Sequence, residues 1–106
     1  MKIVYAGENM KWLRLKKICQ EICNKKVHIH SSTDMPNNHI AGTEFDNEEV
    51  NIILNMQYTK TKNDIIKAVA HEITHVLKNS DEHNIDFEED WKKTENQIIK
   101  KYDEII

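Results

Sequence analysis

The stretch "AVAHEITHVL", residues 68–77, predicts an amphipathic helix with a metal-binding face. At about 100° per residue, its apolar positions fall within one arc of the helix, which should be buried. His71 and His75 lie one turn apart and point away from that arc, so both imidazoles can meet a single metal ion. Glu72 lies between the two directions, where its carboxylate can hold a water molecule on the metal instead of ligating it.

Three other interpretations of this stretch remain open. The chain contains six histidines, so a pair with this spacing can arise by chance on a solvent-exposed helix face. The same zinc site can serve structure or regulation without turnover. The chain can also be a metal-free interaction domain that pairs through an exposed strand edge.

A third ligand is expected downstream, because catalytic zinc usually has three protein ligands and one open position. Asp81 lies six residues after His75, where one large class of zinc peptidases has its third ligand. That class needs a glycine three residues after the second histidine to turn the chain, and here the position is Lys78. We therefore exclude Asp81. His83 lies eight residues after His75 and offers an imidazole, which suits zinc. Its segment, "HNIDF", resembles the downstream histidine segment of SprT-type metallopeptidases.

Glu95 is the other candidate and the one that we predict. It lies near the middle of an apolar stripe on the last predicted helix, between Trp91 and Ile98. A buried, unpaired carboxylate is costly and normally protonates, pairs or coordinates a metal. Glu88 points nearly the same way, but in the first turn it complements the helix dipole. A salt bridge to a lysine is the alternative role for Glu95.

With Glu95 chosen, the sequence reads His71-Glu72-Ile73-Thr74-His75, nineteen residues, then Glu95. This pattern resembles that of the gluzincins, zinc peptidases whose third ligand is a glutamate on a downstream helix, and its spacing is similar to that of thermolysin. At this length, the chain resembles the minigluzincins, minimal archaeal members that are similar to the catalytic domains of membrane-embedded metallopeptidases. The specific match covers residues 68 to about 102.

The resemblance implies a zinc endopeptidase with one Zn²⁺ per chain, held by His71, His75 and Glu95. Glu72 is then the general base, and the substrate is a peptide or unfolded protein lying extended along an edge strand above the active-site helix. The resemblance also implies that the isolated form is latent. The cleft would then be blocked by a neighbour in a homodimer or by the C-terminal segment of the same chain.

Two features of the gluzincin pattern are not matched. Many gluzincins carry an aspartate shortly after the third ligand as a partner for a zinc histidine, but residues 96–99 are Asn, Gln, Ile and Ile. The group that stabilises the oxyanion is also unassigned. Its candidates are His83, Tyr58 and Tyr102.

Composition predicts one soluble, cytoplasmic domain over residues 1–106. Charged residues make up 31% of the chain, yet the net charge is only -3, so the basic excess of nucleic-acid binders is missing. No apolar run approaches the roughly 18 residues that span a bilayer, which argues against a membrane partner. Cys19 and Cys23 share one helix face and are expected to be core residues instead of metal ligands.

The hydrophobic pattern predicts an α+β domain with a small sheet of about three strands. His28, His30 and His39 are expected to be solvated and not to form a second metal site. The expected elements are a strand at 1–5, a helix at about 9–24, a strand at 27–30, a hairpin with strands near 43–45 and 50–54, an active-site helix from an Asn63 cap to about 79, and a last helix from about 87 to near the C-terminus.

Overall fold

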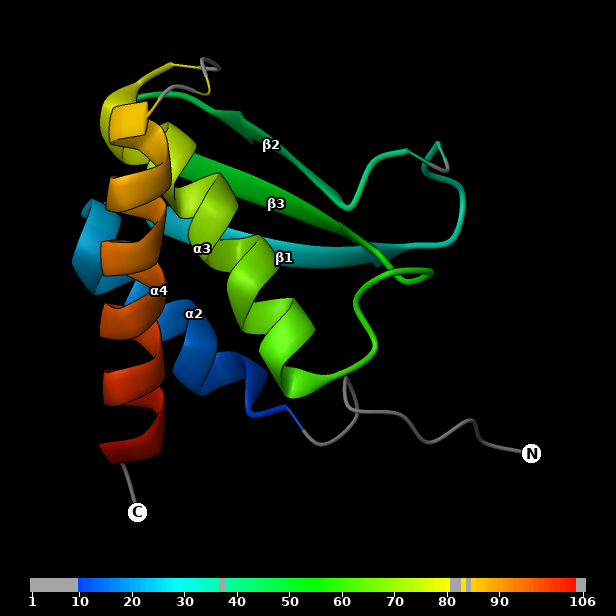
Figure 1. Cartoon of the computed structure of the whole chain (residues 1–106), viewed down its shortest axis with the longest axis horizontal. Helices are drawn as coiled ribbons and strands as arrows, with labels where there is room; N and C mark the ends of the chain where they lie inside the picture. Colours follow the sequence, from blue (N-terminus) through cyan, green and yellow to red (C-terminus); the bar gives the residue numbers. More distant parts are fainter. Residues whose placement is uncertain (1–9, 37, 81–82, 84, 105–106) are drawn as a thin grey trace.

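The computed structural model describes residues 10–36, 38–80, 83 and 85–104, and this part of the chain has an α+β fold (Figure 1). The predicted fold class and the order of the described elements are confirmed. The strand expected at residues 1–5 lies outside the described residues. No described helix is both long enough and apolar enough to cross a membrane. The elements are α2 (Trp12–Cys23), β1 (Lys26–Ser32), β2 (Ala41–Phe45), β3 (Glu49–Asn55), α3 (Lys62–Lys78) and α4 (Ile85–Glu104).

The sheet is mixed and has β3 at its centre, in the order β1-β3-β2. β2 and β3 form the predicted antiparallel hairpin, and β1 runs parallel to β3. The hairpin turns at Asp46, whose carboxylate accepts hydrogen bonds from the backbone N–H groups of Glu48 and Glu49, both 2.8 Å long. β2 therefore forms one edge of the sheet, next to α3.

One face of the sheet packs against the helices and forms the core (Figure 1). Alternate strand residues point into this layer, as the period of a strand requires. The other face carries His28 and His30, and His28 Nε2 lies 3.2 Å from the Glu49 carboxylate. Neither histidine belongs to the metal-compatible cluster found among the described residues. The buried strand residues are Val27, Val50, Ile52 and Leu54.

Helix α3 begins two residues earlier than the sequence pattern indicated. Its N-cap is Thr61, whose Oγ1 accepts a hydrogen bond from the Asp64 N–H, while the Asp64 carboxylate accepts one from the Thr61 N–H. This capping box satisfies two backbone N–H groups, those of Thr61 and Asp64, whereas a cap formed by the Asn63 side chain alone would satisfy fewer. The helix ends at Asn79, as predicted, with Asn79 in the left-handed conformation at φ 51°.

Cys19 and Cys23 are both buried on the core side of α2, which confirms that they are core residues. Burial, with a smaller contribution from the neighbouring Cys23, raises the pKa of the Cys19 thiol to about 12. Burial also raises the pKa of Cys23, although a hydrogen bond to the Lys25 carbonyl opposes this effect.

Both thiols should therefore be unreactive toward DTNB at about pH 8 while the protein is folded, because the thiolate is the reactive form. In guanidinium chloride both should react, and absorbance of the released thionitrobenzoate counts them. Rapid reaction of either thiol in the native protein would contradict the packing of α2 against the sheet.

Candidate metal centre and catalytic cleft

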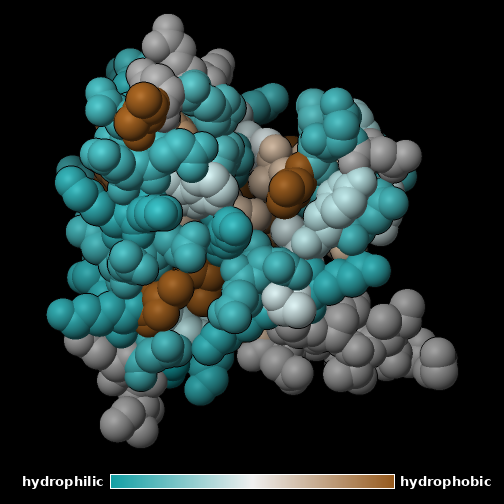
Figure 2. All heavy atoms as spheres, viewed as in Figure 1, coloured by the Kyte–Doolittle hydropathy of each residue, from teal (hydrophilic) through white to brown (hydrophobic). Residues whose placement is uncertain are grey.

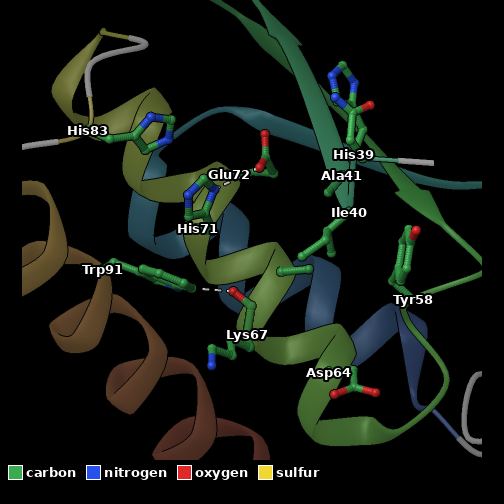
Figure 3. Close-up of a pocket in the computed structure, with 12 residues that line it drawn as sticks. His39, Ile40, Ala41, Tyr58, Asp64, Lys67, His71, Glu72, His83 and Trp91 are labelled. Carbon is green, nitrogen blue, oxygen red and sulfur yellow. Dashed lines mark hydrogen bonds and ion pairs between the residues drawn. The ribbon is translucent and has the colours of Figure 1, made fainter. Parts of the chain in front are cut away.

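Three imidazoles converge at the C-terminal end of α3. His71 and His75 come from the helix, and His83 comes from the segment that joins α3 to α4. One ring nitrogen from each lies within 4.8 Å of the other two. The ring centroids are 4.8 Å apart for His71 and His75 and 4.6 Å apart for His75 and His83. Figure 3 shows the His83 ring approaching His71 from outside the helix.

The spacing of the nitrogens fits a shared metal ion. Nε2 of His75 lies 3.0 Å from Nε2 of His83. Two imidazole nitrogens bound to one tetrahedral zinc at about 2.0–2.1 Å are roughly 3.3 Å apart, so a few tenths of an ångström separate this arrangement from a ligating one.

Hydrogen bonds on the far side of two rings set their tautomers. Nδ1 of His75 donates to the Ser80 carbonyl at 2.8 Å, and Nδ1 of His71 lies 2.9 Å from the Glu72 carboxylate, which can only accept. Each neutral ring then keeps its lone pair on Nε2. A neutral imidazole nitrogen fixed by a partner at the other nitrogen is the form in which histidine binds metals.

Aromatic side chains of α4 cover the histidines. The Phe87 ring lies 5.0 Å from His71 and 4.5 Å from His75, measured between centroids, and is fully buried. The Trp91 ring lies 4.6 Å from His71, and its Nε1 donates to the Lys67 carbonyl (Figure 3). This apolar cover limits solvent access to the imidazoles and holds α4 at a fixed height along α3.

The structure does not bring Glu95 to the histidines. Among the described residues, the metal-compatible cluster of His, Cys, Asp and Glu side chains contains His83 in its place. The cause is the height of α4: Phe87 contacts the histidine pair, and Glu95 comes eight residues later, about 12 Å further along the helix. The apolar stripe predicted which side of α4 carries Glu95, but not how far along α3 this residue lies.

Glu72 lies beside the imidazoles and is buried, with 6% of its surface exposed. Its carboxylate accepts hydrogen bonds from Thr43 Oγ1 at 2.5 Å and from His71 Nδ1. Burial by itself raises the pKa of this carboxyl, but the hydrogen bonds from His71 and Thr43 and the nearby imidazoles outweigh it, and the pKa lies below its ordinary value. Glu72 is therefore ionised near neutral pH and can accept a proton.

A cleft of about 550 Å³ opens in front of Glu72, between α3 and the start of β2. Apolar and neutral side chains line part of this hollow in the space-filling view (Figure 2). In Figure 3, His71, Glu72 and His83 lie on one side of it, and His39, Ile40 and Tyr58 lie on the other, where the Ile40 side chain points toward α3. The lining residues on α3 and α4 are Asp64, Lys67, Ala68, His71, Glu72 and Trp91.

Among the described strands, β2 is an edge strand, and the edge that faces away from β3 has no strand paired with it. Ile40 O accepts from Asn55 N, and Asp46 N donates to Glu49 O, so the even-numbered positions between them face β3. The backbone N–H and C=O groups of Ala41 and Thr43 consequently point away from the sheet. The Thr43 side chain points toward α3, where it contacts Glu72.

Asn55 holds the outer wall of the cleft in place. Its side chain is buried, and its Nδ2 donates to the carbonyls of His39 at 2.6 Å and of Pro36 at 3.3 Å. Its Oδ1 accepts from the Gln57 N–H, and its carbonyl accepts from the Tyr58 N–H. One buried amide thus fixes both segments that carry the wall residues His39 and Tyr58.

The oxyanion candidates lie in different places. Tyr58 lines the cleft, whereas Tyr102 is buried near the start of α2, where its hydroxyl accepts from the Lys11 N–H at 2.9 Å. Tyr102 is thus removed from the site. His39 is an exposed loop residue, as expected, and it also lines the cleft wall. Thr43 and Trp91 have no sequence signal that marks them as neighbours of the site, because their contacts with Glu72 and His71 depend on the packing of β2 and α4 against α3.

Comparison of the chain with protein-family models, curated proteins and solved structures finds no match.

The imidazole cluster predicts a clear difference between two variants in zinc binding. After incubation with zinc and desalting, the wild-type protein should retain about one zinc per chain, and Glu95→Ala should retain the same amount. His83→Ala should lose most of it, because one of three ligands is gone. Metal content is measured by atomic emission.

His28→Ala is the matched control for this experiment, since His28 lies on the outer face of the sheet. It should retain zinc like the wild type. Loss of zinc in Glu95→Ala together with full retention in His83→Ala would restore the glutamate as the third ligand.

Proposed function

We propose that this chain is a zinc-dependent peptidase whose metal is held by His71, His75 and His83 and whose general base is Glu72. The observation that carries this proposal is the convergence of three imidazole nitrogens beside a buried, ionised carboxylate at the end of an open cleft. This ligand set corresponds to the SprT-like alternative and differs from the gluzincin set in its third member.

The chemistry divides between the metal and Glu72. Zinc bound by the three imidazoles would lower the pKa of a water molecule and polarise the scissile carbonyl. Glu72 takes the proton of the attacking water and delivers it to the leaving amine. Thr43 and His71 hold the Glu72 carboxylate in one orientation by their two hydrogen bonds. Tyr58 and His39 line the cleft and are the candidates to donate a hydrogen bond to the developing oxyanion.

An extended peptide is the substrate that fits this cleft. The backbone groups of Ala41 and Thr43 can pair with a peptide main chain, which adds a strand to β2. The α3 side of the cleft runs from His71 to Asp64, seven residues, or about 10 Å. This length matches about three residues of extended chain.

The geometry gives no support to self-inhibition by the C-terminal segment. Phe87 lies at the histidines, and α4 then carries the chain away from them for fifteen residues to Tyr102, about 22 Å. In Figure 1 the end of α4 lies far from the end of α3. Blocking of the cleft by a neighbouring copy in a homodimer stays a prediction.

Glu72→Gln tests the function directly. The variant should keep its zinc and lose hydrolysis of quenched fluorescent peptides by about 100-fold or more, because the amide cannot accept the proton of the attacking water. Glu44→Gln, an exposed change on β2, is the control and should leave the rate unchanged.

Two results would contradict the proposal. Cleavage by Glu72→Gln at the wild-type rate would remove Glu72 from the mechanism. A wild-type protein that is loaded with zinc but inert toward a diverse peptide pool would favour a zinc-stabilised domain without turnover.

Thr43→Val tests the orientation of Glu72. Loss of the hydroxyl should lower kcat by about tenfold and leave zinc content and KM nearly unchanged, because only the support of the general base is removed. Thr43→Ser keeps a hydroxyl and should restore most of the rate. A rise in KM at unchanged kcat would instead assign Thr43 to substrate binding.

A further inference from the structure

The C-terminal end of α3 is closed by a Schellman motif. The Asn79 N–H donates to the Val76 carbonyl, and the Ser80 N–H donates to the His75 carbonyl, both at 3.2 Å. Asn79 has the left-handed conformation that this motif requires, at φ 51° and ψ 44°. Residue 80 is thereby folded back over residue 75.

Two hydrogen bonds join Ser80 and His75, and each residue donates one of them. Besides the backbone hydrogen bond from the Ser80 N–H, the Ser80 carbonyl accepts a hydrogen bond from Nδ1 of the His75 side chain at 2.8 Å. Ser80 therefore closes the helix through its N–H and is the partner of a proposed metal ligand through its carbonyl. The backbone angles of Asn79, which immediately precedes Ser80, set the position of Ser80 and so bring its carbonyl to His75.

We infer that Asn79 is a positioning residue for the metal centre: its left-handed conformation directs the Ser80 carbonyl onto His75 and so fixes the tautomer and orientation of that ring. This inference rests on the proposed metal site, but not on peptidase activity. It assigns a role in zinc affinity to a residue that touches no metal and carries no charge.

Glycine and asparagine adopt the left-handed region readily, whereas β-branched residues are strained there. A β-branched residue at position 79 therefore displaces Ser80, and with it the carbonyl that accepts the hydrogen bond from His75 Nδ1. Without that bond the neutral ring is free to move its proton to Nε2, the nitrogen that faces His83, and a protonated nitrogen cannot ligate.

The chain provides a matched control at the end of α2. Asn24 is also left-handed, at φ 56° and ψ 37°, and its N–H donates to the Gln20 carbonyl at 2.8 Å. Among the described residues, Asn24 and Asn79 are the two non-glycine positions with positive φ. The same substitution at Asn24 imposes comparable backbone strain at the end of α2, a helix that contributes no residue to the cluster of His71, His75 and His83.

The experiment measures zinc affinity by competition with a chromophoric chelator. Asn79→Val should weaken zinc binding by about 10- to 100-fold, the usual range for loss of a partner of a ligating histidine. Asn24→Val should leave it within about twofold, at a similar fall in Tm. Asn79→Gly should bind zinc nearly as well as the wild type, because glycine keeps the left-handed conformation.

A second measurement uses the zinc-free protein. The ¹⁵N shifts of the imidazole nitrogens should report the Nδ1–H tautomer of His75 in the wild type, in Asn24→Val and in Asn79→Gly, and a mixture of tautomers in Asn79→Val. If Asn79→Val does not fold, Asn79→Ala with Asn24→Ala as its control replaces the pair, since alanine is strained less.

The outcomes separate this inference from the proposed function. A wild-type protein that binds no zinc would overturn both. Zinc binding by the wild type with equal losses in Asn79→Val and Asn24→Val would overturn the role of Asn79 alone and leave the histidine cluster in place. An unchanged His75 tautomer in Asn79→Val would also overturn it.

Discussion

The burial of one side of α3 against the sheet is the constraint on which the rest of the site depends. Ile66, Val69 and Ile73 are nearly or fully buried in the core, and a helix that commits this side must turn His71 and His75 toward the opposite side. α4 then covers the histidines with Phe87 and Trp91, whose rings pack directly against the imidazoles. The same packing that stabilises the fold therefore holds the imidazoles of His71 and His75 in a fixed position relative to α4 and in apolar surroundings.

Polar groups beside these nitrogens have partners that come from separate parts of the chain. Glu72 is held by Thr43 of β2, His75 by the carbonyl of Ser80, and the cleft wall by the buried amide of Asn55. Thr43 and Asn55 belong to different strands and lie beside the cleft because the sheet packs on α3, whereas Ser80 is held at His75 by the end of α3 itself. A carboxylate with little solvent contact stays ionised in this setting because two donors point at it.

The sequence was sufficient for the features that depend on local periodicity. It predicted the α+β class, the hairpin, the length of α3 and the position of His71, Glu72 and His75 on its face, because each follows from spacing along one element. The third member of the cluster, His83, was not the residue that the sequence favoured. The helical stripe that favoured Glu95 contains no information on the position of α4 along α3. The parallel pairing of β1 with β3 and the contact between Thr43 and Glu72 were not predicted, because both join segments that are distant in sequence.

The open edge of β2 also has a consequence for the protein in concentrated solution. Unpaired backbone groups on an edge strand can bind the equivalent strand of a second molecule as readily as a foreign chain. β2 is only five residues long, and the exposed charge of Glu44 lies at its middle, two features that discourage such self-association. The short length of β2 and the charge at its middle thus limit the pairing of one copy of the chain with another through this edge.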